Sequence, residues 1–455
     1  MRRGPAVTLM LAVATTVAAC RHPPDSATPS APKDVGVGQE VWDWNGIIGT
    51  GQSLSVGAQA SAVTLTAQPF ENLKLSLGDA GVTVPPYPAD AGSLSLVPLV
   101  EPIRPEATMY PGAYPLNIYG ETPHTAMADQ ISALCEHHRG ERYVTVHTVV
   151  GEGGQGIDVI DKAAAATSNT GHAYAASLFE VAAIERLAAA AGKTYGVTAI
   201  VLTHGETDGR NENYEKQLAK LYEDYNADIR SITRQHRNIP ILLSQQQTCP
   251  GDDSNAASLI SQWRAGVDHP GEIVCAGPKY QYPYAADGIH LTAEGYDRLG
   301  EKYGEVYYEF VVLRHDWQPL QPVSVGRTGK VITVNFHVPA PPLAWDDGVP
   351  APHRAVHTAW ANGRGFEVQN RTGDVRIVAA AIRGNSVEIS LADDPGPAGL
   401  VVRYAMTQDG VGPQGGRAGG RVGQLRDSDP WIGYATKRPQ YNYALSFVLP
   451  VLSEP

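Results

Sequence analysis

The sequence predicts an α/β fold built on a parallel sheet, followed by a smaller all-β domain. Between residues 40 and 313, short apolar runs alternate with amphipathic helical stretches, which is typical of βαβ units whose sheet is covered by helices on both faces. After Trp317 this rhythm stops, and apolar residues recur at every second position. That period is typical of strands with one buried face. We therefore expect a three-layer αβα domain at 39–316 and a sandwich-like β domain at 317–455.

Five apolar runs are expected to form the parallel sheet. They are residues 46–50 (GIIGT), 143–150 (YVTVHTVV), 197–203 (VTAIVLT), 239–244 (IPILLS) and 272–275 (EIVC). The helices expected between them are 175–191, 214–236, 255–267 and 292–313. Gly192 supplies a natural end for the first helix, because glycine readily adopts the left-handed conformation found there. Residues 64–116 contain nine prolines and interrupt the alternation, so we expect a long insertion over one end of the sheet.

Two segments of the second domain show the alternation most clearly. Their apolar positions are Ile332, Val334, Phe336 and Val338, then Val387, Ile389 and Leu391. Turns rich in Gly, Asp and Pro separate such segments, as in a β-sandwich. A domain of this kind either binds substrate or braces the first domain, and the sequence favours neither role.

The charge balance excludes one class of partner. Apolar residues make up 43% of the 455 residues, which is enough for buried cores, and charged residues make up 18%. The net charge is −12, and no segment concentrates Lys and Arg. Because affinity for a phosphate backbone depends on such a concentration, the chain is not expected to bind nucleic acid.

Residues 1–20 are expected to be an export signal. Two arginines precede an apolar run, residues 7–17, that is too short to span a bilayer. The segment ends in Val17-Ala18-Ala19-Cys20, which resembles the lipobox of bacterial lipoproteins. The resemblance implies a lipid on Cys20 and an exported chain anchored to the membrane of the cell envelope, while an ordinary secretory signal is the alternative. Residues 21–38, rich in Pro, Ser and Ala, are expected to be a flexible tether.

Three cysteines remain beyond this leader: Cys135, Cys249 and Cys275. An oxidising compartment makes one disulfide plausible, and Cys249 and Cys275 each follow an expected strand on the same side of the sheet. We therefore favour that pair and expect Cys135 to be a buried thiol. No spacing of Cys and His is typical of a zinc site, so no metal is expected.

Four short segments contain the candidate chemistry. They are residues 51–55 (GQSLS), 151–156 (GEGGQG), 204–209 (HGETDG) and 287–291 (DGIHL). Each follows an expected strand. Because ligands bind outside the carboxyl ends of the strands in an open parallel sheet, we expect all four segments to meet at one edge.

Ser53, Asp287 and His290 are the residue types that nucleophilic catalysis needs. A serine on a tight turn after a strand exposes its hydroxyl and places backbone N–H groups near a developing oxyanion. Asp287 and His290 lie three residues apart, so the carboxylate can orient an imidazole whose other nitrogen reaches Ser53. Glycines in the second segment allow a backbone N–H to approach a substrate oxygen closely.

In combination, the four segments resemble the conserved blocks of the SGNH (GDSL-like) hydrolase superfamily, in its branch of sialate O-acetylesterases and carbohydrate esterases. That branch shows GQS, a GG pair, QGExD and DxxH in this order, and the resemblance spans residues 40–313. It implies a triad of Ser53, His290 and Asp287 and a reaction without any cofactor. It also implies an oxyanion hole formed by the backbone of Ser53, the backbone of Gly154 and a side chain of the third block.

The third block departs from the branch at its first position. His204 stands where the branch has Gln, and it either donates a ring N–H to the oxyanion or only shapes the loop. Further candidates for substrate contact are Gln52, Glu206, Asp208 and Gln245. A pair of glycosidase carboxylates would be another explanation for Glu206 and Asp208, and the nearby serine and DxxH segment make it the weaker one.

The leading hypothesis is a serine esterase that removes acyl groups from a carbohydrate. That the acyl group is acetyl and the alcohol a glycan rests on the resemblance, because a fold does not determine a substrate. An esterase for lipid or polyester acyl chains is the nearest alternative and would need a wide apolar pocket. The second alternative is a non-catalytic, glycan-binding envelope lipoprotein, against which the intact Ser53, Asp287 and His290 argue.

Overall fold

The computed structural model describes most of the chain after the leader and tether. The described ranges are residues 42–60, 62–76, 94–103, 120–165, 172–247, 256–396, 399–408 and 421–453. Cys20, the expected tether and Cys249 lie outside them. Within these ranges, none of the helices combines the length and the apolar character that crossing a membrane requires.

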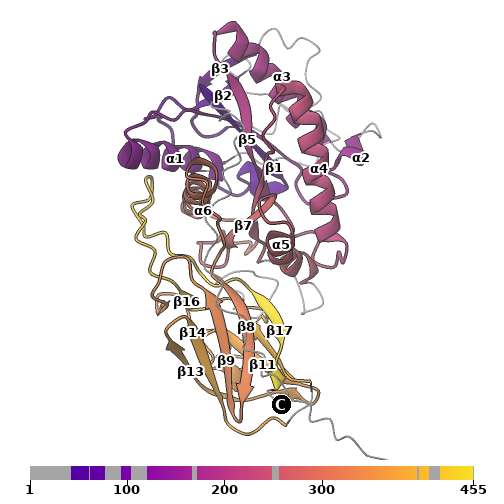
Figure 1. Ribbon diagram of the computed structural model, residues 1–455, viewed down its shortest axis with the longest axis vertical. Coiled ribbons are helices and arrows are strands. Elements are labelled where there is room, and N and C mark those ends of the chain that lie inside the picture. Colours follow the sequence, from indigo (N-terminus) through magenta and orange to yellow (C-terminus); the bar gives the residue numbers. More distant parts are fainter. Residues whose placement is uncertain are drawn as a thin grey trace, which may run out of the picture. The chain divides into compact units, whose positions relative to one another are not determined.

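A seven-stranded sheet with the order β3-β2-β4-β1-β5-β6-β7 forms the centre of the first domain (Figure 1). Its strands are β1 (Trp44–Gly51), β2 (Leu73–Ser76), β3 (Ser95–Pro98), β4 (Thr145–Gly151), β5 (Tyr195–Thr203), β6 (Ile241–Gln245) and β7 (Ile273–Pro278). All pairings are parallel except that of β2 with β3. The five expected runs are β1, β4, β5, β6 and β7, so the predicted parallel sheet is confirmed.

Helices cover both faces of this sheet. They are α1 (Pro123–Arg139), α2 (Lys162–Ala165), α3 (His172–Ala190), α4 (Tyr214–Thr233), α5 (Ala257–Asp268) and α6 (Ala293–Tyr307), which continues as a π-helix, η6 (Tyr308–Val312). Two neighbouring residues of β1 separate the layers. Ile47 belongs to the core formed with α1 and α6, whereas Ile48 belongs to the core formed with α3, α4 and α5. Because successive side chains of a strand point to opposite faces, the domain has αβα layers.

The proline-rich stretch contributes more structure than the sequence predicts. Its segments β2 and β3 pair antiparallel, and β2 extends the sheet by pairing with β4. Helix α1 follows and is also absent from the expected elements. It begins after Thr122, whose hydroxyl accepts a hydrogen bond from the backbone N–H of His124, and it ends at Gly140 in the left-handed conformation.

The C-terminal region forms separate, mainly antiparallel sheets. One has the order β13-β14-β9-β8-β18, the second has the order β12-β11-β15-β17, and β10 pairs with β16. The strands are β8 (Gln321–Thr328), β9 (Val331–His337), β10 (Ala344–Trp345), β11 (Phe366–Asn370), β12 (Gly373–Asp374), β13 (Ile377–Arg383), β14 (Ser386–Leu391), β15 (Val401–Tyr404), β16 (Leu425–Arg426), β17 (Phe447–Pro450) and β18 (Leu452–Ser453). Alternate residues of β9 and β14 are buried, which confirms the predicted period of two.

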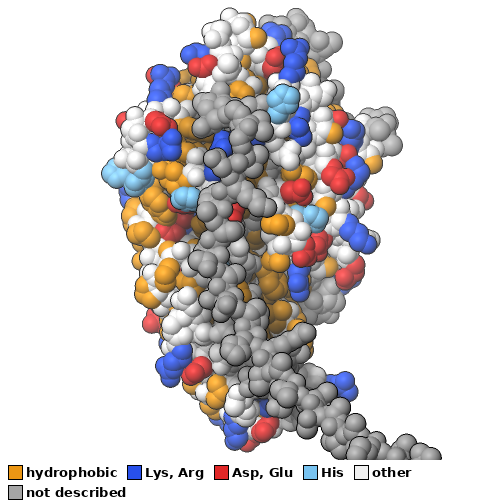
Figure 2. All heavy atoms as spheres, in the orientation of Figure 1, with side chains coloured by type: hydrophobic (Ala, Val, Ile, Leu, Met, Phe, Trp, Pro, Cys, Tyr) orange, Lys and Arg blue, Asp and Glu red, His pale blue; other side chains and the backbone are white. Residues whose placement is uncertain are grey.

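Residues Val41–Pro455 form one compact unit, so both regions belong to the same body. The division at residue 317 into two domains stays a prediction. On the face shown in Figure 2, Lys and Arg side chains are scattered among Asp and Glu side chains.

Candidate active site

The carboxyl ends of three strands lie side by side at the centre of the sheet. Gly51, the last residue of β1, pairs with Gly151 of β4 on one side and with Thr203 of β5 on the other. The chain places β4 on one side of β1 and then β5 on the opposite side, so the strand order reverses at β1. Ligands of open α/β sheets bind in the crevice at such a reversal. Three of the four predicted segments begin there.

Ser53 lies on a tight turn that two glycines permit. It starts a short 3-10 helix, η1 (Ser53–Val56), which ends at Gly57 with a φ of 77°. Gly51 has a φ of 138°, and a Cβ at this position would lie 2.2 Å from the carbonyl oxygen of Thr203. The backbone N–H of Ser53 belongs to the first turn of η1 and has no acceptor among the described residues. It is therefore available to a ligand.

Ser53, His290 and Asp287 form a continuous chain of hydrogen bonds. Oγ of Ser53 lies 2.7 Å from Nε2 of His290, and Nδ1 of His290 lies 2.6 Å from Oδ2 of Asp287. The other carboxylate oxygen, Oδ1, accepts hydrogen bonds from the backbone N–H groups of Ile289 at 2.9 Å and His290 at 3.0 Å. The loop that supplies the imidazole thus also fixes the carboxylate. In this arrangement the imidazole can accept the serine proton.

The environment keeps Asp287 ionised and leaves the site open to water. Burial raises the pKa of the Asp287 carboxyl, but hydrogen bonds from the His290 ring and from the backbone N–H groups of His290 and Ile289 outweigh it and hold the pKa below its usual value. The side chain of His290 is 15% exposed and that of Asp287 is 32% exposed. Both groups can therefore meet a substrate that arrives from solvent.

The second segment, residues 151–156, begins at the carboxyl end of β4 and contains a backbone donor, the N–H of Gly154. Gly154 is exposed, has a φ of 71°, and has no atom within 4 Å of a Cβ built on it. Its N–H has no acceptor in the ranges that the structure describes. Asp208 holds this segment, because its Oδ2 accepts from the N–H of Ile157 at 2.9 Å while its Oδ1 accepts from the Asn211 amide at 2.8 Å. The Asp208 carboxylate therefore ties the third segment to the second.

His204 does not offer a donor to an oxyanion. The ring is fully buried, with Nε2 at 3.1 Å from the carbonyl oxygen of Gln155 and Nδ1 at 2.9 Å from the hydroxyl of Tyr214. Because a carbonyl only accepts, Nε2 carries the proton and Nδ1 accepts from Tyr214. Burial lowers the pKa of His204, so the ring is neutral and keeps no free N–H. Of the two roles considered for His204, this geometry supports the shaping of the loop and argues against the oxyanion role.

Glu206 and Gln52 lie next to the site but are largely engaged with protein groups. The Glu206 side chain is 5% exposed and forms an ion pair with Lys279, whose side chain is 1% exposed. Gln52 is buried, and its Oε1 accepts a hydrogen bond from Oγ1 of Thr207 at 3.4 Å. Lys279 is absent from the predicted site residues. Its position directly after β7, at the same sheet edge as the other segments, is the signal that would have identified it.

The expectation that Gln245 contacts substrate is not supported by its surroundings. Gln245 is fully buried, and its amide donates to the carbonyl oxygens of Leu259 and Ser446, both at 3.0 Å. Its Oε1 accepts from the N–H of Ser446 at 2.8 Å. Both amide hydrogens are used, so Gln245 joins β6 to the segment that leads into β17.

Among the described residues, neither the cysteines nor the metal-binding residue types add chemistry to the site. Cys135 and Cys275 are both buried, and burial raises the pKa of each thiol to about 12. Since Cys249 lies outside the described residues, its pairing with Cys275 stays a prediction. Within the ranges given above, no group of three or more His, Cys, Asp or Glu side chains is arranged to hold a metal ion.

The fold of the chain is similar to those of several solved structures. XAC1771, a carbohydrate acetylesterase from Xanthomonas citri, is similar with a TM-score of 0.54 and 12% identity, over 89% of this chain and 80% of that chain. A protein from Arabidopsis thaliana has a TM-score of 0.43 and 15% identity, over 59% of this chain and 98% of its own. Est24, a carbohydrate acetylesterase from Sinorhizobium meliloti, has a TM-score of 0.28 and 13% identity, over 58% and 99%. The first likeness supports the α/β fold followed by a β region, and the other two are too weak to bear on it.

Part of the sequence also matches a known family. No curated protein matches it. Residues 143–309 match the family model described as carbohydrate esterase, sialic acid-specific acetylesterase. The matched range contains Gly154, His204, Asp287 and His290, whereas Ser53 precedes it. The chain is thus a carboxylic ester hydrolase, and its residues 143–309 are similar to the carbohydrate esterase family of sialic acid-specific acetylesterases.

Proposed function

We propose that the protein hydrolyses acetyl esters on a carbohydrate, with Ser53 as the nucleophile. The observation that carries this proposal is the chain of short hydrogen bonds from Asp287 through His290 to Ser53, at 2.6 Å and 2.7 Å. The family match supports the acetyl group and the carbohydrate. The reversal of strand order at β1 supports the place of the site.

In the first half of the reaction, Oγ of Ser53 attacks the carbonyl carbon of the acetyl ester. Its proton passes to Nε2 of His290, and the carbonyl oxygen becomes an oxyanion. The unpaired N–H groups of Ser53 and Gly154 are the proposed donors to this oxygen. The bond to the sugar oxygen then breaks, and His290 gives its proton to that oxygen. The products are a free sugar hydroxyl and an acetyl group on Ser53.

In the second half, a water molecule repeats the attack on the acetyl group of Ser53. His290 takes a proton from the water, and acetate leaves when Oγ of Ser53 recovers that proton. Asp287 orients the imidazole throughout and stabilises its protonated form. The lowered pKa of Asp287 supports this role, because the carboxylate stays ionised while His290 carries the proton.

The exported, lipid-anchored state is part of the same proposal. It is supported by the run of residues 7–17 and by the lipobox-like sequence that ends at Cys20. A lipid on this residue would hold the esterase at a membrane of the cell envelope. The mass of the mature chain tests the proposal: a lipid adds its acyl mass to Cys20, and Cys20→Ala abolishes the addition.

Hydrolysis of p-nitrophenyl esters of increasing chain length tests the catalytic proposal. We expect the chain from residue 21 to prefer acetate, to release acetate from acetylated xylan, and to react with a fluorophosphonate probe. Ser53→Ala should abolish all three. Ser55→Ala is the matched control, because the buried Ser55 hydroxyl donates to the Gln52 carbonyl and does not meet His290; its rate should stay within about tenfold.

Two results would direct the assignment elsewhere. A preference for long acyl chains would favour lipid or polyester esters as substrates. If Ser53 does not react with the probe and both proteins are inert on every ester, the chain is a binding protein and the proposal is wrong.

A further inference from the structure

A cavity away from the candidate active site lies between α1 and a loop of the C-terminal region, Trp431–Lys437. Its volume is about 660 Å³, within the range of sites for small molecules. Because α1 leads into β4, and β4 runs toward the edge that holds Ser53, the last turn of α1 lies at the opposite edge of the sheet. No residue that lines the cavity belongs to the four segments of the candidate active site.

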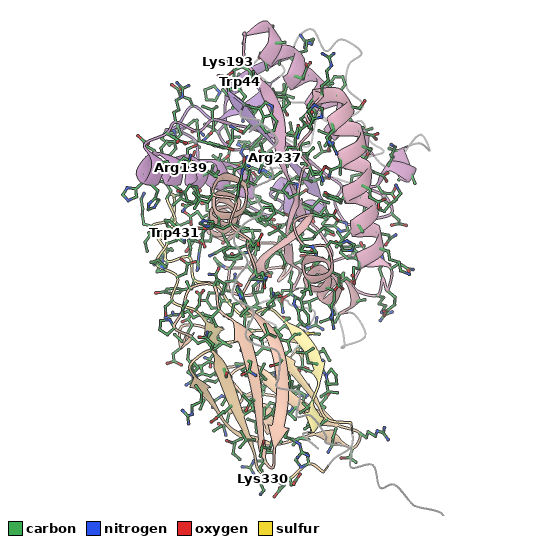
Figure 3. All side chains as sticks on the ribbon, in the orientation of Figure 1. Trp44, Arg139, Lys193, Arg237, Lys330 and Trp431 are labelled. Carbon is green, nitrogen blue, oxygen red and sulfur yellow. The ribbon has the colours of Figure 1, made fainter. Side chains whose placement is uncertain are left out.

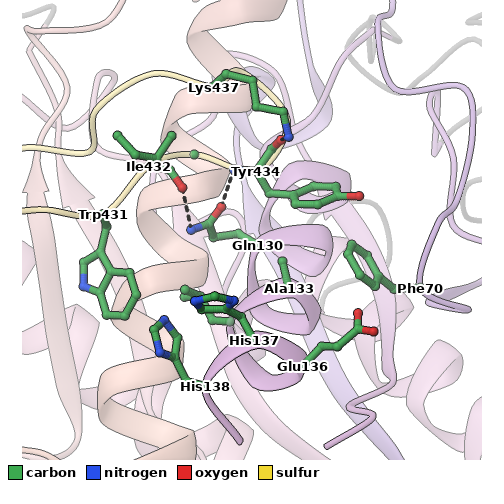
Figure 4. Close-up of a pocket in the computed structure, with 12 residues that line it drawn as sticks. Phe70, Gln130, Ala133, Glu136, His137, His138, Trp431, Ile432, Tyr434 and Lys437 are labelled. Atoms are coloured by element: carbon green, nitrogen blue, oxygen red, sulfur yellow. Dashed lines mark hydrogen bonds between the residues drawn. The ribbon is translucent and has the colours of Figure 1, made fainter. Parts of the chain in front are cut away.

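Buried hydrogen bonds hold the loop in place against the helices. The amide of Gln130 on α1 donates to the carbonyl oxygen of Ile432 at 3.4 Å and accepts from the N–H of Tyr434 at 2.6 Å (Figure 4). The carboxylate of Glu301 on α6 accepts from the N–H and the hydroxyl of Thr436 at 2.7 Å and 2.6 Å. Gln130 and Glu301 are both buried, so the cavity is shaped by fixed elements.

Aromatic side chains form two walls of this cavity. On one side, the rings of Phe70 and Tyr434 meet edge to face with centroids 4.9 Å apart. On the other side, the rings of His138 and Trp431 meet at 4.9 Å and an angle of 85°. Trp431 lies beside α6 in Figure 3 and packs against Tyr308. These contacts position the ring faces before any ligand arrives.

Hydrogen-bonding groups without protein partners also line the cavity. In the part of the chain that the structure describes, the hydroxyl of Tyr434, the rings of His137 and His138 and the carboxylate of Glu136 make no hydrogen bond. One acidic and one basic side chain, Glu136 and Lys437, line the cavity, so neither sign of charge dominates. In Figure 2, histidine and hydrophobic side chains lie close together over the end of α1.

We propose that this cavity binds a pyranose unit of an uncharged glycan chain. A pyranose ring has apolar C–H faces and edges that carry hydroxyl groups, so it matches aromatic walls with interspersed donors and acceptors. The choice of a carbohydrate as ligand rests on the proposed function, whereas binding itself does not involve Ser53. The cavity therefore holds the polymer at a place separate from the ester that is hydrolysed.

Isothermal titration calorimetry on the Ser53→Ala chain from residue 21 tests this proposal, because that variant cannot alter its ligand. The probes are xylohexaose, cellohexaose, mannohexaose and chitohexaose. We expect at least one to bind, and Tyr434→Ala or His138→Ala to weaken it by about tenfold or more. Tyr441→Ala is the matched control: like Tyr434 it is half-buried under a cation, with Arg426 3.7 Å from its ring centroid, and it should leave binding unchanged.

The proposal is overturned if none of the four probes binds, or if Tyr434→Ala and His138→Ala bind as tightly as the Tyr441→Ala control. Two variants are used because Tyr434 belongs to the held loop and His138 does not. Both are also made with Ser53 intact, where p-nitrophenyl acetate hydrolysis should be unchanged. Full esterase activity of Ser53→Ala would refute the proposed function and leave the binding result as it stands.

Discussion

Replacing Asp287 with Asn isolates the charge and the orientation that this residue gives to His290. An Asn side chain keeps one carbonyl oxygen, which can still accept the N–H groups of Ile289 and His290 that now bind Oδ1 at 2.9 Å and 3.0 Å. Its amide nitrogen then occupies the place of Oδ2. The reverse orientation is unfavourable, because it would direct the amide N–H groups at two backbone donors.

The amide nitrogen would reverse the proton positions on the imidazole. Nδ1 of His290 would accept from the new side-chain amide, so the ring proton would move to Nε2, 2.7 Å from Oγ of Ser53. A protonated Nε2 cannot take the serine proton. The same change in a Ser-His-Asp site lowers kcat by roughly 10⁴, which corresponds to about 5 kcal/mol in the activation free energy. The free energy of unfolding should change by less than about 1 kcal/mol, since the backbone contacts persist.

The assay is kcat/KM for p-nitrophenyl acetate, with urea unfolding of the same preparations. Asp394→Asn is the matched control, because Asp394 also accepts a backbone N–H in a loop, from Gly396 at 3.0 Å, and lies in the C-terminal region. Its activity should equal that of the unmodified chain. If Asp287→Asn retains more than about a tenth of kcat/KM, the assigned role of this carboxylate is wrong.

Three further changes test the surroundings of the site. Gln245→Ala leaves the N–H and carbonyl of Ser446 without their side-chain partner. Urea unfolding should therefore show a free energy of unfolding lower by about 3 kcal/mol, with KM unchanged. A raised KM at full stability would instead support contact between Gln245 and the substrate. Lys279→Met leaves the buried Glu206 carboxylate unpaired and should lower the free energy of unfolding by about 3–5 kcal/mol. The double variant Lys279→Met/Glu206→Gln should recover most of this loss. Equal losses in both proteins would contradict a buried ion pair. Burial lowers the pKa of His124 to about 3. Below about pH 6.5 the unfolded chain therefore binds a proton at His124 that the folded chain does not bind, which destabilises the folded state. As the pH falls from 7 to 4.5, the loss in free energy of unfolding should be about 3 kcal/mol larger than in His124→Gln.

The sheet could be predicted because its central strands are buried on both faces. A strand of this kind is a continuous apolar run, and β1, β4, β5, β6 and β7 each appear as one in the sequence. Helix α1 was missed because it is buried nearly all round, including its polar residues Asp129 and Gln130, and so lacks an amphipathic period. Thr122-Pro123 at its start and Gly140 at its end were the available signals.

The residue types at the site could be predicted, but their hydrogen-bond partners could not. Ser53, Asp287 and His290 were identified by order and spacing, and the structure places their atoms in contact. His204 and Gln245 have equally suitable side chains at the same edge of the sheet. Their hydrogen-bond partners, Gln155 and Ser446, come from other segments of the chain, so no local sequence pattern predicts these contacts.

Site residues and framework residues at the carboxyl edge of the sheet differ in whether their hydrogen-bond donors and acceptors have protein partners. A buried polar group must find a partner, so a fully satisfied side chain such as Gln245 belongs to the framework. Ser53 and Gly154 differ because their backbone N–H groups have no acceptor among the described residues, and the Ser53 hydroxyl already faces a base. Gly154 is exposed and Ser53 is half-buried, so water can hydrate both donors and the carbonyl oxygen of a ligand can replace that water. These two available donors are the reason why the proposed mechanism directs the oxyanion of the ester at the backbone of Ser53 and Gly154.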